Sequence, residues 1–87
     1  MTYRILIGPA AQRDLRSLPR KILRQVDAKI LALAHNPRPP GSKKLEGGQD
    51  LWRIRSGDFR ILYQIHDDIL RILVVRVGNR RDVYRGV

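Results

Sequence analysis

The stretch LWRIRSGDFRILYQI, residues 51–65, alternates apolar and polar side chains on both sides of Gly57-Asp58. Alternation with a period of two is typical of β-strands, and a glycine at the first position of a two-residue turn favours a type II′ hairpin. A turn of this length sets the register, so that Arg55 should face Arg60 and Trp52 should face Tyr63. The stretch therefore predicts an antiparallel hairpin with two chemically different faces.

The two predicted faces differ in charge. The apolar face, which we expect helices to cover, carries Trp52, Ile54, Phe59, Ile61, Tyr63 and Ile65. The opposite face carries Leu51, Arg53, Arg55, Arg60, Leu62 and Gln64. An arginine opposite an arginine destabilises a sheet. Three clustered guanidiniums with no carboxylate on their face favour a bound phosphate, although extension into solvent or pairing with acids elsewhere in the fold is the alternative.

The segment before the hairpin predicts one strand and two helices. The alternating run at 2–7 is a strand that Gly8-Pro9 ends, and Pro9 suits the first turn of a helix. Apolar residues at 11, 15 and 18 predict a short amphipathic helix, which Pro19 ends. Within 19–36 a second helix has an apolar stripe formed by Leu23, Val26, Ile30 and Leu33, flanked by Ile22 and Ala34.

The remaining segments complete an α+β domain. Residues 36–42, NPRPPGS, form a loop, and turns are expected at Gly47-Gly48 and Asp67-Asp68. The long apolar run of the last strand, Ile69 to Gly78, indicates a central place in the sheet. The order β-α-α-β-β-β predicts a single domain over residues 1–87, with a helical hairpin packed on one face of a mostly antiparallel four-stranded sheet.

Charge is the most informative bulk property of the chain. Eighteen Lys and Arg against eight Asp and Glu give a net charge of +10, spread over both halves. Such an excess favours a polyanionic partner, either nucleic acid, an acidic protein or an anionic lipid surface, over simple solubility. There is no apolar run of about 18 residues to span a membrane, and the first residues lack the long apolar centre and cleavage site of a signal peptide, so we expect none. The absence of cysteine fits a cytoplasmic location.

The tail and the isolated histidines complete the list of candidate groups. Arg80, Arg81 and Tyr84 follow the last strand, and a tyrosine beside arginines can stack a base while the phosphate is held. Taken alone, Tyr84 is more often an ordinary surface aromatic. His35 and His66 have no second imidazole or carboxylate at ligand spacing, and no nucleotide-binding glycine loop is present. We therefore expect neither a metal nor a cofactor.

The segments KKLEGGQDLWRIRSGDFRILYQI and VVRVGNRRDVY, with the helical hairpin before them, resemble the RelE group of toxins within the RelE/ParE superfamily. The resemblance implies a metal-independent endoribonuclease that cleaves mRNA in the ribosomal A site by 2′-hydroxyl attack on the adjacent phosphate. It also implies a cytoplasmic toxin, monomeric alone, that a RelB-like antitoxin holds inactive in a higher-order complex.

The resemblance further implies roles for individual residues. Arg53 and Arg55 would act near the nucleophile and Arg60 at the transition-state phosphate. Arg80 would lie beside the leaving oxygen, and Tyr84 would stack on the RNA. The other basic positions expected to contact RNA or the ribosome are Lys43, Lys44, Arg81 and Arg85.

This sequence departs from the best-known members of the group, because Arg53 and Arg55 stand where they carry lysines. A guanidinium with a pKa above about 12 is not a credible general base, so electrostatic stabilisation and positioning are expected instead. Two other functions stay open at this point. One is a ParE-like toxin that acts on DNA gyrase, and the other is a non-catalytic basic module that only binds RNA or DNA.

Overall fold

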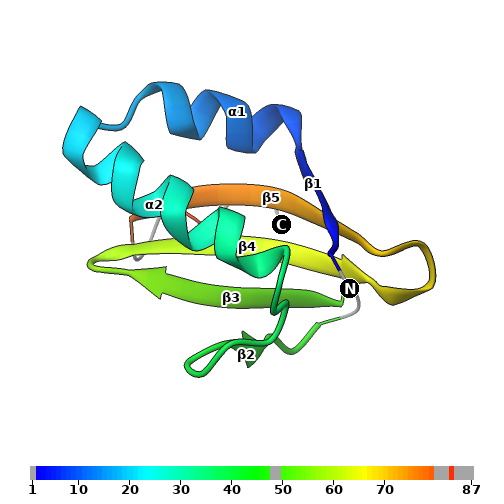
Figure 1. The fold of residues 1–87 in the computed structure, drawn as a ribbon. Helices are drawn as coiled ribbons and strands as arrows, with labels where there is room; N and C mark the ends of the chain where they lie inside the picture. The colour runs from blue at the N-terminus through cyan, green and yellow to red at the C-terminus, as the bar shows by residue number, and fades with distance from the viewer. Residues whose placement is uncertain (1, 48–49, 80–82, 84–87) are drawn as a thin grey trace.

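The computed structural model describes residues 2–47, 50–79 and 83, and it has two helices on one face of a five-stranded sheet (Figure 1). The helices are α1 (Pro9–Arg16) and α2 (Arg20–Leu33). The strands are β1 (Arg4–Ile7), β2 (Lys43–Lys44), β3 (Leu51–Ser56), β4 (Phe59–His66) and β5 (Arg71–Asn79). A 3-10 turn (Asp67–Ile69) joins β4 to β5. The α+β class is confirmed.

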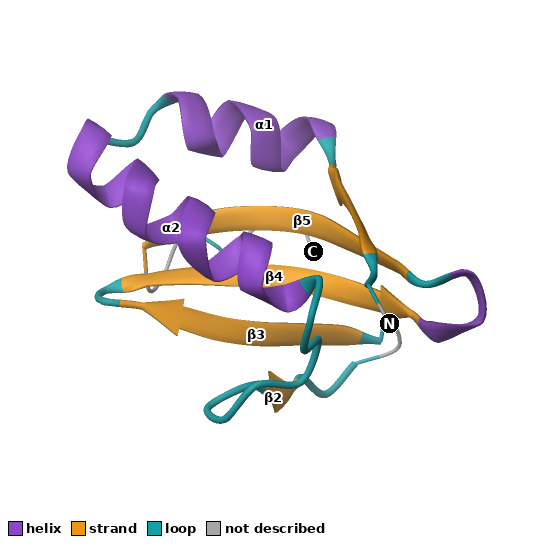
Figure 2. Cartoon of the chain, viewed as in Figure 1, coloured by secondary structure: helices purple, strands orange, loops and turns teal. Residues whose placement is uncertain are grey.

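The strand order across the sheet is β1-β5-β4-β3-β2 (Figure 2). Only β1 and β5 run parallel, so the sheet is mostly antiparallel, and β5 has the central place that its apolar run predicted. The predicted count of four strands was wrong, because the two residues of β2 pair with β3 and add a fifth. A strand this short carries no periodic pattern from which it could be recognised.

The register of the β3–β4 hairpin is the predicted one at every pair, from Leu51 opposite Gln64 to Ser56 opposite Phe59. Gly57 has φ +60°, whereas Asp58 does not have a positive φ, which is the pattern of a type II′ turn. Glycine adopts this left-handed conformation without the steric cost that a Cβ brings. Turn chemistry and alternation therefore place the three hairpin arginines on the face away from the helices.

The core lies between the two helices and the apolar face of the sheet. Its fully buried members include Val26, Leu33, Ile61, Tyr63 and Ile72. In the α2 stripe, Ile22 and not Leu23 is the first residue that packs against the core, which corrects one position of the predicted stripe. Neither helix in the described part of the chain is long and apolar enough to cross a membrane.

An ion pair attaches α1 to the edge of β5 beyond the end of β1. The Arg76 Nε donates to Asp14 Oδ2 at 2.8 Å, and the Val77 backbone N–H donates to the same oxygen at 2.9 Å. Both side chains of the pair are mostly buried, at 24% and 19% exposure. One carboxylate thus satisfies a strand-edge N–H and neutralises a partly buried arginine, which fixes α1 over β5.

The loop at 36–42 is held against the sheet by side chains from distant segments. The buried Tyr63 hydroxyl donates to the Pro37 carbonyl at 2.7 Å, and burial raises the pKa of Tyr63 to about 12. The Arg38 guanidinium lies 5.2 Å from the Trp52 ring centroid and pairs with Asp67 at 2.8 Å. Because Arg38 and the Tyr3 hydroxyl both donate to this carboxylate, the pKa of Asp67 is lowered.

Candidate functional site

The face of the sheet opposite the helices carries a row of basic side chains near the hairpin turn. Arg55 and Arg60 are cross-strand partners, and Lys43 of β2 is the partner of Arg53. Side chains of directly opposed residues lie on the same face of a sheet, so these four cations share one surface. We call Lys43, Arg53, Arg55 and Arg60 the basic face.

The pairing geometry brings Arg55 and Arg60 close together. The two-residue turn makes Ser56 and Phe59 a hydrogen-bonded pair, so the next pair, Arg55 with Arg60, is of the non-hydrogen-bonded kind. Cα atoms in such pairs are about 4.5 Å apart, the closer of the two antiparallel spacings. Two arginine side chains therefore begin next to each other, on one face, at the base of the turn.

The surface beside Arg60 is hollowed. Its partner on β5 is Gly78, which has no side chain, and a hollow of about 240 Å³ is lined by Arg55, Gly57, Asp58, Arg60 and Asn79. Val83 lies over Gly78, since a Cβ placed on that glycine would be 3.6 Å from the Val83 Cβ. Asp58 also lines this hollow and brings one carboxylate to it. The two predicted faces did not include Asp58, because it belongs to the turn.

Arg53 and Arg55 have no acceptor within the described part of the chain. Neither side chain makes a hydrogen bond or ion pair there, and the Nε of Arg53 is buried without a partner. An unsatisfied buried donor costs roughly 1–3 kcal/mol, more when it is charged. One alternative for these two arginines was pairing with acidic residues elsewhere in the fold. Neither arginine pairs with an acidic residue that the structure describes.

The remaining predicted binding residues fall in two groups. Lys43 lies on the basic face, whereas Lys44 is on the other side of β2 and pairs with Asp50 at 3.6 Å. The predicted positions Arg80, Arg81, Tyr84 and Arg85 lie outside the described residues. The structure therefore brings together Arg53, Arg55, Arg60 and Lys43 from the predicted set.

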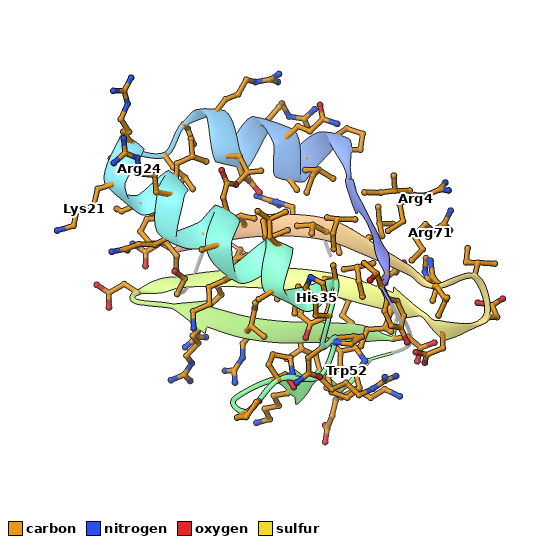
Figure 3. The ribbon with its side chains drawn as sticks, viewed as in Figure 1. Arg4, Lys21, Arg24, His35, Trp52 and Arg71 are labelled. Carbon is orange, nitrogen blue, oxygen red and sulfur yellow. The ribbon has the colours of Figure 1, made fainter. Side chains whose placement is uncertain are left out.

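A second basic cluster, which the sequence reading missed, lies at the other end of the sheet. Arg4 of β1 and Arg71 of β5 are cross-strand partners, and their side chains lie side by side (Figure 3). The Arg71 Nε donates to His66 Nδ1 at 3.0 Å, so this nitrogen acts as the acceptor. The cluster depends on the parallel pairing of the first and last strands. The spacing of residues in the sequence does not reveal that pairing.

The arrangement suits electrostatic stabilisation of an anion. Guanidiniums donate planar pairs of hydrogen bonds to phosphate oxygens, and Arg55 and Arg60 approach one hollow from neighbouring strands. Within the described segments, no group of three or more His, Asp or Glu side chains is placed to hold a metal ion. Phosphate recognition by clustered cations is the chemistry that these residues support.

Comparison with known proteins gives consistent similarities. The family model described as ParE toxin of type II toxin-antitoxin system, parDE, matches residues 5–84. The toxin RelG of Mycobacterium tuberculosis is 31% identical over 86 residues, covering 98% of this chain and 99% of that protein. The mRNA interferase toxin RelE of Escherichia coli K12 is 29% identical over 82 residues, covering 92% and 85%.

Solved structures give the same result for the fold. The archaeal RelE–RelB complex from Pyrococcus horikoshii OT3 contains a chain that superposes with a TM-score of 0.81 at 31% identity. The match covers 94% of this chain and 99% of that one.

Proposed function

This chain belongs to the ParE toxin family of type II toxin–antitoxin systems and is a RelE-type toxin, and from that premise we propose that it cleaves mRNA in the ribosomal A site. The observation that carries the proposal is that Arg53 and Arg55, on the same face as Arg60, have guanidiniums with no partner among the described residues. The name of one relative, an mRNA interferase toxin, supports the same activity.

The proposed reaction is an internal transesterification of the RNA backbone. The 2′-oxygen attacks the adjacent phosphorus, the bond to the 5′-oxygen breaks and that oxygen takes a proton from water, which leaves a 2′,3′-cyclic phosphate and a 5′-hydroxyl. Negative charge grows on the phosphate oxygens in the transition state, and preorganised cations stabilise that charge. Arg60 would act on this phosphate, while Arg53 and Arg55 would lie near the 2′-oxygen. Arg80 and Tyr84 are proposed to serve the leaving oxygen and the stacked base.

The proton of the 2′-hydroxyl needs an acceptor other than arginine. A guanidinium retains its proton at any pH near neutrality, because its pKa exceeds about 12. We propose that water or ribosomal RNA takes the proton, while Arg53 and Arg55 lower the effective pKa of the hydroxyl. The cleavage rate should then rise log-linearly with hydroxide through neutral pH. A bell-shaped profile centred near pH 7 would contradict this assignment.

The partner proposed for the basic face is a RelB-like antitoxin. The similar archaeal toxin was solved in complex with RelB, and the charge of +10 on this chain suits an acidic segment that covers the cations. We propose that the free toxin is monomeric and cytoplasmic and that it forms a larger complex with the antitoxin.

The test is in vitro cleavage on ribosomes programmed with a defined mRNA. Wild-type protein should produce cuts phased with the codon in the A site, with 5′-hydroxyl ends, and a 2′-O-methyl group at the cut nucleotide should abolish them. Products with 5′-phosphate ends, or cleavage that survives the methyl group, would overturn the mechanism.

A ParE-like activity is the second candidate, because the matching family model carries that name. Inhibition of purified DNA gyrase, without any cut in ribosome-bound mRNA, would favour it. The two assays use the same purified chain, so each serves as the control for the other.

A further inference from the structure

A pocket of about 460 Å³ lies between α2 and the outer edge of β3. Its wall comes from three segments: α2 contributes Lys29 and Ala32, the loop contributes 39–41, and β3 contributes Arg53, Ile54 and Arg55. β2 pairs with Trp52 and Arg53, and the Leu45 N–H donates to the Leu51 carbonyl at 2.8 Å, so among the described residues only the part of the β3 edge after Arg53 has no neighbouring strand.

The uncovered edge also exposes backbone groups. Ser56 and Ile54 form hydrogen-bonded pairs with β4, so the N–H and C=O of Arg55 point away from β4 toward the outer edge. No described residue bonds to the Arg55 backbone on that side. A free N–H directed at a pocket is a ready donor to an anion.

The charges around this pocket all have the same sign. Among the described residues, the charged ones that line it are Lys29, Arg53 and Arg55, and none of those lining it carries a carboxylate. None of the three side chains makes an ion pair or hydrogen bond within the described segments, and the buried Nε of Arg53 has no acceptor. Like charges around one hollow repel one another, so an anion in the pocket would lower the energy of the arrangement.

Arg55 connects this pocket to the hollow beside Arg60, because it lines both. A strand that places one phosphate at Arg60 would therefore pass over Arg55 before it reaches Lys29. An RNA strand supplies a phosphate at every nucleotide, so adjoining hollows that share one arginine suit neighbouring phosphates.

We propose that the pocket lined by Lys29, Arg53 and Arg55 is a second phosphate-binding site, which holds an RNA phosphodiester next to the one to be cleaved. The inference rests on the proposed function for the identity of the ligand as RNA. It makes Lys29 of α2 a substrate-positioning residue, although it lies outside the hairpin and outside the predicted set.

The test is binding of a short single-stranded RNA, 2′-O-methylated throughout so that it cannot be cleaved, to the free full-length chain. Fluorescence anisotropy would compare wild type with Lys29→Ala, Lys29→Arg and the control Lys21→Ala. Lys21 lies on the same helix, eight residues or about 12 Å along its axis, and projects outward at its beginning (Figure 3). Both lysines are exposed, so these variants should fold, and thermal melting checks that they do.

Lys29→Ala should weaken RNA binding roughly three- to tenfold, as expected for one partly exposed charge-assisted contact. It should also reduce the salt slope of log K by about 0.7, the value for one phosphate of a single strand. Lys29→Arg should bind within about twofold of wild type, and so should Lys21→Ala. Equal weakening by Lys29→Ala and Lys21→Ala would overturn the proposal, because net charge alone would then explain the effect.

The proposed function can fail independently of this inference, since binding of an uncleavable RNA requires neither a ribosome nor chemistry. A Lys29 effect on binding, in a protein that cuts no mRNA, would retain the pocket and reject the nuclease. If Lys29→Ala changes neither the cleavage of mRNA nor the binding of RNA, the nuclease is retained and the pocket is rejected. If a polyglutamate peptide binds more tightly than the RNA and depends on Lys29, the pocket serves an acidic protein and the proposal is wrong.

Discussion

Arg55 and Arg60 lie directly opposite each other in the β3–β4 hairpin, in the closer, non-hydrogen-bonded kind of antiparallel pair. Directly opposed like charges destabilise a sheet, and Arg55 has no acceptor among the described residues that would offset the repulsion. The pair is therefore a feature that folding alone does not favour, and its removal should separate stability from activity.

Arg55→Gln keeps a polar, although shorter, side chain and removes its charge. The free energy of unfolding should stay unchanged or rise by up to about 1 kcal/mol, because a repulsive cross-strand pair is lost. Cleavage of ribosome-bound mRNA should fall by about 10²–10³, the usual loss for one preorganised donor. Urea unfolding and a cleavage time course measure the two effects. Arg24→Gln on α2 is the matched control and should alter neither; a marked loss of stability in Arg55→Gln would show a structural role instead.

Asp14→Ala should destabilise the fold by about 1.5–3 kcal/mol. It leaves the mostly buried Arg76 without its partner and removes the acceptor of the Val77 N–H, both of which Asp14 now satisfies. Asp27→Ala, an exposed acid on α2, should cost much less. A double-mutant cycle with Arg76→Met isolates the pair, and an interaction energy near zero in urea unfolding would contradict the role given to it.

The pH dependence of stability should include a contribution from Asp67. Hydrogen bonds from Arg38, and then from Tyr3, hold the pKa of this carboxyl below its ordinary value of 3.8. A carboxyl whose pKa is lower in the folded state than in the unfolded state stabilises the folded protein at pH values above its unfolded pKa. That contribution is lost as pH falls through the pKa of the folded state. Asp67→Asn should therefore be less stable than wild type at neutral pH, and the difference should decline as pH falls below 3.8 and be lost below the folded pKa. Urea unfolding between neutral and acidic pH measures this. A difference independent of pH would exclude the linkage, and Asp68→Asn is the neighbouring control.

Gly8→Ala should destabilise the protein by roughly 1–3 kcal/mol, as overpacking does. A Cβ at this position would lie 3.1 Å from the Val74 carbonyl oxygen, which already accepts the Gly8 N–H at 2.8 Å. Gly78→Ala is the matched control, because its Cβ would meet Val83 at an ordinary 3.6 Å. Thermal or urea unfolding of the two variants compares them; equal stability would show that the β1–β5 junction yields without cost.

The hairpin shows how far local pattern reaches. Its register, its turn and the separation of its arginines from its apolar side chains follow from alternation around Gly57-Asp58, and the structure confirms all three. Each depends on residues at most 13 positions apart, from Leu51 to Gln64, so short-range geometry is sufficient. Similar local signals explain why Pro9 and Pro19 correctly mark where the two helices begin.

Other features depend on contacts between distant parts of the chain. Asp14 and Arg76 are 62 residues apart, and Arg38 and Asp67 are 29 apart, yet each pair ties one element to another. Charged residues with no periodic pattern have many conceivable partners in the sequence, and only the packed fold selects one. The same holds for Lys29, which lines one pocket with Arg53 and Arg55 only because α2 packs beside β3.

The amino-acid sequence by itself determined which arginines share a face, since side-chain direction in a strand has a fixed period and a tight turn sets the register. The tertiary structure alone decided which cations are neutralised and which are left for a ligand. Arg76 finds a carboxylate, whereas Arg53 and Arg55 find none among the described residues. The physical reason is that charge pairing acts through space over a few ångströms, and distance in space is settled only when helices and sheet pack together.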